Sequence, residues 1–316
     1  MSVKLAVVGL GAFGQKHLDA LTQIPDAEIR YVGHSRMEVA ESVAEKYGAK
    51  AAFTDYAELL SQSDLDGVIL ATPTQLHLSQ TLQALEAGKH VQVEIPMADN
   101  LAGVQQIVDM QGKTGLVAMA GHTRRFNPSH QYLHQKIQAG ELSIQQLDVQ
   151  TYFFRRSNLN ALGNPRSWTD HLLWHHAAHT VDLFQYQTGE KVVRANAIQG
   201  PKHPELGIAM DMSIQLQSES GKICTLSLSF NNDGPLGSFF RYICDNGTFI
   251  ARYDDLLNGK EEPIDVSKVA VSMNGIELQD REFVAAIKDG RQPNSSVAMV
   301  LPAYQVLHQL SLQLDY

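Results

Sequence analysis

A glycine-rich loop near the start of the sequence constrains the fold more than any other feature. The segment Gly9-Leu10-Gly11-Ala12-Phe13-Gly14 matches the pattern G-x-G-x-x-G, with the apolar run Lys4–Val8 before it and a helical pattern after it. A second apolar run, Ile29–Gly33, follows at the distance that a dinucleotide-binding unit needs. A tight turn without a ligand is the alternative, but this context favours glycines that let the backbone approach a pyrophosphate. We expect the cofactor to contact Gly9, Gly11, Ala12, Phe13 and Gly14.

The first part of the sequence alternates short apolar runs with amphipathic helical patterns. This order is typical of a doubly wound parallel sheet. We expect strands at Lys4–Val8, Ile29–Gly33, Gly67–Ala71, His90–Glu94 and Leu116–Ala120. We expect helices at Phe13–Leu21, Glu38–Tyr47, Leu78–Ala87 and Leu101–Thr114. The sequence therefore predicts an α/β Rossmann dinucleotide-binding domain over residues 1–121.

From residue 145 the pattern changes to longer strands with alternating polarity. We expect them at Gln145–Phe154, Val192–Gln199, Ile208–Gln217, Lys222–Asn231, Ser238–Asp245 and Thr248–Tyr253. We expect helices at 126–140, 168–188, 281–289 and 296–314. Residues 122–316 are thus predicted to form an α+β domain for substrate binding and oligomerisation, with a large open and mostly antiparallel sheet. Thr225, Ser227 and Ser229 share one face of a strand, which is either solvated or flat enough to meet a partner's sheet.

Composition excludes several classes of protein. At 316 residues and 44% hydrophobic content, the chain can bury a large core. Its net charge of −9 argues against nucleic acid or an anionic membrane as a partner. No run approaches the roughly 18 apolar residues of a membrane span, and no signal peptide follows Met1. Two cysteines, Cys224 and Cys244, fit a reducing cytoplasm and are expected to be small buried hydrophobes.

The residues at the end of the second strand indicate whether the cofactor is NAD or NADP. An NAD-binding protein usually has an acidic residue there for the ribose 2′-hydroxyl. This sequence has Gly33-His34-Ser35-Arg36, and its first acid is Glu38. A hydroxyl and a guanidinium suit a 2′-phosphate, so we predict NADP, bound by Ser35 and Arg36, with NAD as a possible substitute. The alternative for Arg36 is a solvated loop arginine.

Histidines are concentrated before Asp182. On a helix, His171, His175 and His179 would share one face, with Asp182 one turn further, while His176 would point about 100° away. Groups that titrate near neutrality suit proton transfer or anion binding, whereas hydrogen-bonded core histidines are the alternative. Histidines at this spacing can also bind zinc, but no Cys or H-E-x-x-H pattern supports it, and we expect no metal.

These landmarks together resemble the Gfo/Idh/MocA family of NAD(P)-dependent oxidoreductases. The resemblance rests on the glycine loop, Thr72-Pro73 with His77, Glu94-x-Pro96, Arg125-Phe126 and His179-x-x-Asp182. It implies a Rossmann domain followed by an open-sheet domain, and assembly through those sheets as a homodimer or homotetramer. It also implies a cofactor contact from Glu94. Thr72 and Pro73 end a core strand at the carboxyl edge of the sheet, where we expect them to contact the cofactor, and a simple strand-ending turn is the alternative.

The catalytic residues of this family are altered here. The family uses the lysine of Glu-Lys-Pro, an aspartate four residues before a histidine, and that histidine. The corresponding positions are Ile95, His175 and His179. Isoleucine cannot donate a proton, so the lysine's role is absent or moved. We expect His179 to be the general base, with His175 as the second candidate or as the group that orients it.

Other segments resemble family members that oxidise the cyclic hemiacetal of a dicarboxylate semialdehyde with NADP, in the breakdown of aromatic compounds. These segments are Gly121–Pro128, Tyr152–Arg156, Ser167–Asp182 and Phe230–Gly234. Residues 121–170 hold six Lys or Arg and three Asp or Glu, as a small anionic substrate would require. The substrate-binding candidates are His122, Arg124, Arg125, Arg155, Arg166, Trp168 and Asp182. A dehydrogenase of another hydroxy acid or sugar, or a non-catalytic NADP-binding regulator, is the alternative.

Overall fold

The computed structural model describes residues 2–159, 163, 165 and 169–314, which divide into two compact units. The first unit contains the described residues of Met1–Gly121, Asn160–Trp168 and Ile276–Leu301. The second contains the described residues of His122–Leu159, Thr169–Gly275 and Pro302–Tyr316. The sequence interpretation placed 276–301 in the second domain, whereas the structure places this segment in the first unit. This segment belongs to the first unit because it makes tertiary contacts there. Asp280 hydrogen-bonds His17, and the Ser295 hydroxyl donates to the Ala120 carbonyl oxygen.

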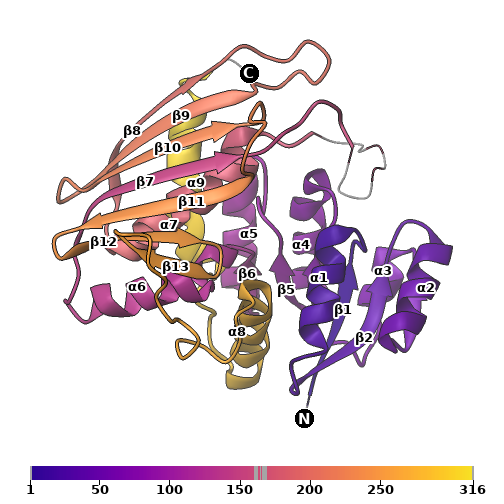
Figure 1. The fold of residues 1–316 in the computed structure, drawn as a ribbon. Helices are drawn as coiled ribbons and strands as arrows, with labels where there is room; N and C mark the ends of the chain where they lie inside the picture. Colours follow the sequence, from indigo (N-terminus) through magenta and orange to yellow (C-terminus); the bar gives the residue numbers. More distant parts are fainter. Residues whose placement is uncertain (1, 160–162, 164, 166–168, 315–316) are drawn as a thin grey trace. The chain divides into compact units, whose positions relative to one another are not determined.

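The first unit is built on a six-stranded parallel sheet with the order β3-β2-β1-β4-β5-β6. Strands β1, β2, β5 and β6 of this sheet are labelled in Figure 1. Its strands are β1 (Val3–Val8), β2 (Ala27–Gly33), β3 (Ala51–Phe53), β4 (Gly67–Leu70), β5 (His90–Val93) and β6 (Ala118–Ala120). Its helices are α1 (Ala12–Leu21), α2 (Met37–Tyr47), α3 (Tyr56–Leu60), α4 (His77–Glu86), α5 (Leu101–Thr114) and α8 (Gly275–Asp289). The predicted Rossmann sheet is confirmed, but the short strand β3 was not expected.

The strand order reverses between β1 and β4. Because parallel crossovers are right-handed, this reversal puts α1 and α2 on one face of the sheet and α4 and α5 on the other. Consistent with this, α4 and α5 contact each other. Helices on both faces explain why the central strands are continuous apolar runs, with Leu5, Val7 and Ile69 fully buried.

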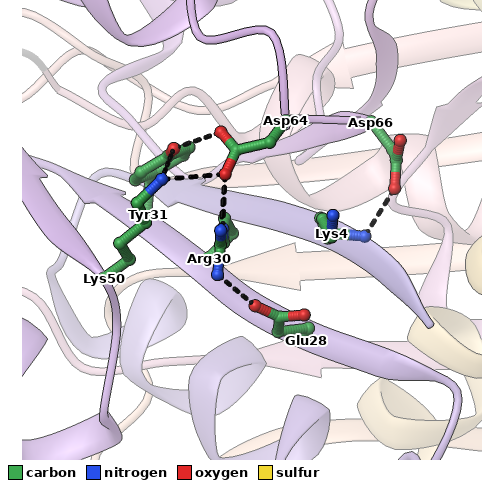
Figure 2. Close-up of polar contacts among 7 residues, drawn as sticks. All are labelled: Lys4, Glu28, Arg30, Tyr31, Lys50, Asp64 and Asp66. Atoms are coloured by element: carbon green, nitrogen blue, oxygen red, sulfur yellow. Dashed lines mark hydrogen bonds and ion pairs between the residues drawn. The ribbon is translucent and has the colours of Figure 1, made fainter.

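An ion-pair cluster centred on Asp64 connects strand β2 to Lys50, the residue before β3 (Figure 2). The Asp64 carboxylate accepts hydrogen bonds from Arg30 Nε and Lys50 Nζ, each at 2.9 Å, and from the Tyr31 hydroxyl. Arg30 also pairs with Glu28 at 2.8 Å. These three donors hold the pKa of Asp64 below its ordinary value. The cluster satisfies its own charges, so we assign it a structural role.

The second unit is built on a seven-stranded sheet with the order β13-β12-β11-β7-β10-β9-β8 (Figure 1). Its strands are β7 (Ile144–Tyr152), β8 (Val192–Gln199), β9 (Asp211–Ser218), β10 (Ile223–Ser229), β11 (Gly237–Cys244), β12 (Gly247–Arg252) and β13 (Asp255–Asn258). Only the β7–β10 pair is parallel among the pairings of these strands, so the predicted mostly antiparallel sheet is confirmed. Along β10, Cys224, Leu226 and Leu228 are buried, whereas Thr225 and Ser227 on the other face are partly exposed.

The helices of the second unit include α6 (Pro128–Gln138), α7 (Ala178–Thr188) and the end of α9 (Val297–Ser311). A π-helical turn, Leu172–Ala177, directly precedes α7. Within the parts of the chain that the structure describes, no helix combines the length and apolar character that a membrane crossing requires.

Candidate functional site

The glycine loop of the first unit forms a cradle that side chains would fill. Gly9 has a φ of +92°, and a Cβ there would lie 2.5 Å from the carbonyl carbon and oxygen of Ala71. A Cβ on Gly14 would lie 1.9 Å from the Gly9 carbonyl oxygen, so helix α1 can approach the loop only with glycine here. A Cβ on Gly11 would meet nothing within 4 Å, which leaves open space at the middle of the loop. The loop is therefore closely packed beneath and open where a ligand would lie.

Helix α1 begins at this open space with its backbone N–H groups available. Its N-cap is Gly11, without a side-chain cap, and its first turn carries no acidic residue. Unpaired N–H groups and the helix dipole favour an anion at this end. Phe13 is 54% exposed, and the Lys16 ammonium lies 4.9 Å from the centre of its ring. This arrangement fits the pyrophosphate of a dinucleotide.

The residues predicted to distinguish NADP from NAD follow strand β2. Ser35 and Arg36 are exposed, and Arg36 is the N-cap residue of α2. The Arg36 backbone N–H donates to His34 Nδ1 at 3.1 Å, which fixes the turn that carries both side chains. An exposed guanidinium beside a hydroxyl can bind a phosphate.

Strands β4 and β5 end in segments joined by His77. Its ring nitrogens lie 2.8 Å from the Thr72 carbonyl oxygen and 2.8 Å from the Pro96 carbonyl oxygen. The Thr72 hydroxyl donates to Gln80 Oε1 at 2.6 Å. His77 thus holds together the Thr72-Pro73 turn and the segment after Glu94, both at the carboxyl edge of the sheet, where a Rossmann fold binds its cofactor.

Beside Glu94, the structure reveals a buried charged cluster that sequence reasoning missed. His17 Nδ1 lies 2.9 Å from both carboxylate oxygens of Asp280, and its Nε2 lies 3.1 Å from Glu94 Oε1. Gln92 Nε2 donates to Asp280 Oδ1 at 2.7 Å. Burial alone would lower the pKa of His17, but Asp280 and Glu94 outweigh it and raise this pKa to about 10. His17 lies one turn after Gly14, and this position could have indicated that it lies near the cofactor loop. Nothing in the sequence indicated that Asp280 would contact it.

In the second unit, the expected helix over 168–188 begins later than predicted. His171 is extended (φ −112°, ψ 133°) and precedes the helix, where its Nδ1 accepts from the Leu173 N–H at 3.1 Å. His175 then lies in a π-helical turn, and regular α-helix starts at Ala178. The prediction that His171, His175 and His179 share one face was therefore wrong, because it assumed a regular α-helical repeat throughout. His175 instead accepts the His171 backbone N–H on its Nδ1 at 3.0 Å.

His179 lies in the first turn of α7 and has unused hydrogen-bonding capacity. Its Nδ1 is buried, and no hydrogen bond reaches it from any described residue. Burial, and then the charges of Arg124, His122 and His176, lower the pKa of His179 well below its ordinary value. His122 packs edge-on against it, with ring centres 6.0 Å apart. The imidazole is therefore neutral at physiological pH and can accept a proton.

Asp182 lies one turn further along α7 and is bound by two of the predicted site residues. Arg125 donates to it from Nε at 2.8 Å and from Nη2 at 2.6 Å, and His122 Nδ1 lies 3.5 Å away. Burial raises the pKa of Asp182, but Arg125 and His122 outweigh this effect and hold the pKa below its ordinary value. The charge of Arg125 is thus balanced within the protein.

Arg124 lies between two aromatic rings. Its guanidinium carbon is 4.7 Å from the centre of the Tyr253 ring and 5.9 Å from that of Phe240. Its Nη1 donates to Asn127 Oδ1 at 3.3 Å, and its buried Nε has no partner among the residues that are described. No ion pair of Arg124 with a described carboxylate is present either. This cation is held between the two rings and interacts electrostatically with Asp254, and its Nε keeps an N–H without a partner among the described residues.

Arg155 is held by Asp170. Its Nη2 donates to Asp170 Oδ2 at 2.5 Å, and its guanidinium carbon lies 4.7 Å from the centre of the Phe230 ring. His176 Nε2 lies 3.7 Å from the same carboxylate oxygen. The neighbouring Arg156 is exposed and lies over Phe154, 4.2 Å from the ring centre. The predicted candidates Arg166 and Trp168 lie outside the described residues.

Two other kinds of site were considered. In the described ranges 2–159, 163, 165 and 169–314, no group of three or more His, Cys, Asp or Glu is arranged to hold a metal ion. Both cysteines are free. Burial raises the pKa of the Cys224 thiol and, to about 11, that of Cys244. Thiols with such pKa values are poor nucleophiles at neutral pH.

Comparison with known proteins shows two family matches and a similar relative. Residues 3–122 match the model of an oxidoreductase family with an NAD-binding Rossmann fold, and residues 128–270 match that of bacterial oxidoreductase C-terminal regions. The chain is 68% identical over 313 residues to the 4-carboxy-2-hydroxymuconate-6-semialdehyde dehydrogenase of Sphingobium sp. (strain NBRC 103272 / SYK-6), covering 99% of each protein.

More distant relatives act on other compounds. The scyllo-inositol 2-dehydrogenase (NAD(+)) of Bacillus subtilis (strain 168) is 34% identical over 141 residues, 44% of this chain and 41% of that protein. Among solved structures, a levoglucosan dehydrogenase in complex with NADH superposes with a TM-score of 0.87 at 18% identity, over 99% of this chain and 97% of that one. The structural match supports the fold alone.

Proposed function

Because the chain belongs to the Gfo/Idh/MocA oxidoreductase family, we propose that it oxidises 4-carboxy-2-hydroxymuconate-6-semialdehyde, in its cyclic hemiacetal form, to 2-pyrone-4,6-dicarboxylate. The 68% identity with a dehydrogenase of that semialdehyde supports this substrate. The reaction belongs to protocatechuate 4,5-cleavage in the breakdown of aromatic compounds. NADP is the proposed electron acceptor, and NAD is the possible substitute.

The hemiacetal form explains how an aldehyde can be oxidised without a nucleophilic cysteine. Hydride transfer needs a tetrahedral carbon that carries both the hydrogen and an oxygen, and many aldehyde dehydrogenases make it with a thiolate. A substrate closed on its own hydroxyl group already has such a carbon. The buried thiols of Cys224 and Cys244, whose pKa values are raised, agree with a mechanism that does not use them.

His179 is the proposed general base, because it keeps the position of the family's catalytic histidine and its lowered pKa leaves the imidazole neutral. The neutral imidazole takes the proton of the hemiacetal hydroxyl as that oxygen forms the lactone carbonyl. When bound, the nicotinamide would supply the acceptor for the hydride of that carbon, which carries both electrons of the oxidation. His175 is the proposed partner that orients His179, and its own ring accepts a hydrogen bond from the His171 N–H. Ile95 has no part in proton transfer.

Arg124 is the proposed principal cation for a substrate carboxylate. It is fixed between Tyr253 and Phe240, and its Nε lacks a partner among the described residues. A rigid guanidinium binds a carboxylate with little loss of entropy. Arg125 and Arg155 already bind Asp182 and Asp170, so we propose that they support the pocket, with Arg155 as a secondary contact. Arg166 and Trp168 remain candidates from the sequence.

The cofactor is proposed to bind residues up to Gly121, and the substrate to bind the unit that contains His122–Leu159 and Thr169–Gly275. Gly9, Gly11, Ala12, Phe13 and Gly14 would hold the pyrophosphate, and Thr72, Pro73 and Glu94 would border the nicotinamide. Ser35 and Arg36 would bind the 2′-phosphate, which is the basis for proposing NADP. The free cysteines and the need for NADP also agree with a cytoplasmic enzyme. The partly exposed face of β10 supports a homodimer or homotetramer through this sheet.

The alternative is a dehydrogenase of another hydroxy compound, such as the inositol named for the Bacillus subtilis relative. This alternative is disfavoured because Ile95 occupies the position of the family's catalytic lysine. The test is to mix the protein and NADP with the freshly prepared semialdehyde or with inositols, and to follow nicotinamide absorbance and the formation of the pyrone. Turnover of the semialdehyde alone is expected. Turnover of inositols alone would refute the proposed substrate, and binding of NADP without any turnover would indicate a regulator.

A further inference from the structure

A buried chain of three charged side chains ends at the cofactor edge of the first unit. Asp280 of α8 and Glu94 after β5 lie on opposite sides of the His17 ring of α1. His17 and Asp280 are completely buried, whereas the Glu94 side chain is 15% exposed. The cluster therefore reaches solvent only through Glu94.

The geometry fits a positively charged His17, although burial also raises the pKa of Asp280. Each ring nitrogen lies 2.9 to 3.1 Å from a carboxylate oxygen, and a carboxylate accepts hydrogen bonds. A neutral imidazole could donate to only one of them. Asp280 and Glu94 are the two charged groups that face His17, and the amide of Gln92 binds Asp280 as a neutral donor. The imidazolium is therefore balanced by Asp280 within the unit, and it holds Glu94 in place.

Glu94 is directed to the edge where the strands of the Rossmann sheet end. Its backbone N–H donates to the Leu70 carbonyl oxygen at the end of β4, at 2.9 Å. Its Oε1 binds His17, and no described residue donates to its Oε2. A Cβ on Gly121 would lie 2.6 Å from Oε1, so glycine at 121 leaves the room that this carboxylate occupies. The adjacent Ile95 supplies no charge, which makes His17 the cation that fixes Glu94 in this chain.

We propose that His17 and Asp280 are positioning residues that fix the Glu94 carboxylate, so that its free oxygen accepts a hydrogen bond from the amide of the nicotinamide ring. Asp280 keeps the proton on His17, and His17 fixes the orientation of Glu94. The inference rests on the dinucleotide-binding part of the proposed function and is independent of the substrate. In this arrangement His17 and Asp280 fix Glu94 at the carboxyl edge of the Rossmann sheet without the family's lysine.

The test is a comparison of cofactor binding by wild type and Asp280→Asn, measured by NADPH fluorescence from pH 6 to 9. Asparagine keeps the size of the side chain but removes the charge that holds the His17 proton. The wild-type affinity should change less than about twofold over this range. The variant should lose about tenfold as its His17 deprotonates, which corresponds to one charge-assisted hydrogen bond. Histidine ¹⁵N spectra should show the His17 ring titrating near neutrality only in the variant.

Two probes separate positioning from a general structural effect. The fragment 2′,5′-ADP lacks the nicotinamide and should bind both proteins equally. The 3-acetylpyridine analogue of NADP lacks the amide N–H groups, so Asp280→Asn should weaken it far less than it weakens NADP. If the fragment loses as much affinity as NADPH, or if the variant shows the wild-type pH dependence, the proposal is refuted. None of these measurements uses the semialdehyde, so failure of the substrate assignment would leave them unaffected.

Further variants cover the case in which Asp280→Asn does not fold. Gly121→Ala places a methyl group against the Glu94 carboxylate and should displace it from His17. This variant should weaken NADPH but not 2′,5′-ADP, and its unchanged binding of 2′,5′-ADP shows that it is folded. Asp64→Asn is the matched control, because it breaks an Asp ion pair of the same unit that takes no part in this cluster. It should leave both affinities unchanged. Equal binding of NADPH by Gly121→Ala and wild type would also overturn the proposal.

Discussion

Arg125 and Asp182 form a bidentate ion pair, with Nε–Oδ2 and Nη2–Oδ1 distances of 2.8 and 2.6 Å. Both side chains are almost completely buried, and the pair joins residues that are 57 positions apart in the sequence. The Arg125 guanidinium also lies 4.6 Å from the centre of the Tyr186 ring. This pair connects the segment after His122 to helix α7, which carries the proposed base His179.

Breaking this pair should destabilise the protein strongly. Asp182→Asn would leave the buried charge of Arg125 without its carboxylate, and such changes cost about 3–5 kcal/mol. Urea unfolding should report that loss of free energy. The control Asp64→Asn breaks ion pairs with Arg30 and Lys50 that are more exposed, and it should cost clearly less because solvent screens such pairs. Equal losses for both variants would mean that burial does not strengthen the Arg125–Asp182 pair.

Replacing the proposed base should remove turnover and spare cofactor binding. His179→Ala is expected to lower kcat by about 10² to 10⁴, the usual contribution of a general base. NADPH affinity should stay within about twofold, because the glycine cradle and Arg36 belong to the other unit. His175→Gln should cost less, since His175 is assigned an orienting role. If kcat is retained in His179→Ala and lost in His175→Gln, the roles are reversed.

The pH dependence of kcat/KM should locate the same base. His179 must be neutral to accept a proton, and its pKa is lowered by burial and by the charge of Arg124, among others. The acid limb of kcat/KM, which reports the free enzyme, should therefore lie below pH 6.5, the ordinary histidine value. Arg124→Met removes one lowering charge and should move this limb upward, besides raising KM. An acid limb that Arg124→Met leaves in place would exclude His179 as the titrating group.

Arg36 should distinguish the two nicotinamide cofactors. Arg36→Ala removes the proposed partner of the 2′-phosphate, and loss of one charged hydrogen-bonding partner costs about 1.5–3 kcal/mol. NADPH should therefore bind at least about tenfold more weakly, while NADH affinity should hardly change. Isothermal titration with both cofactors measures this difference. An equal loss of affinity for NADPH and NADH would mean that Arg36 stabilises the turn after β2 and does not bind the 2′-phosphate.

Local sequence patterns predicted most of the architecture, because they record which residues a strand or helix buries. Val192–Gln199 and Leu101–Thr114 were predicted with the bounds that the structure has. The strands β3 (Ala51–Phe53) and β13 (Asp255–Asn258) were missed because they contain no β-branched residue of the kind that marks β4 and β5. The π-helical turn before α7 was missed for another reason, because an i, i+4 spacing does not reveal a change in helical pitch.

The candidate site was predictable only where its chemistry is local in sequence. The glycine loop could be recognised because its function needs a fixed spacing between strand, turn and helix. The contact between His17 and Asp280 spans 263 residues and depends on how α8 packs in the first unit. Likewise, the sequence did not show which of the candidate arginines has its charge balanced within the protein. The structure shows that Asp182 balances the charge of Arg125.

The protonated state of His17 should also appear in the stability of the protein. Its folded pKa of about 10 lies above the ordinary value of 6.5, so the folded state retains a proton that the unfolded state loses. The resulting stabilisation is fully present below pH 6.5 and is lost as pH rises through about 10. Within this window the free energy of unfolding should fall by up to about 1.4 kcal/mol per pH unit.

Urea unfolding of wild type and His17→Gln at pH 6, 7, 8 and 9 measures this effect as a difference, which cancels the titration of other groups common to both proteins. Glutamine still donates a hydrogen bond but has no proton to lose. The free-energy gap between the two proteins should therefore be largest at pH 6 and narrow steadily toward pH 9. A gap that stays constant over this range would mean that His17 carries the same charge in the folded and unfolded states, and that Asp280 does not hold its proton.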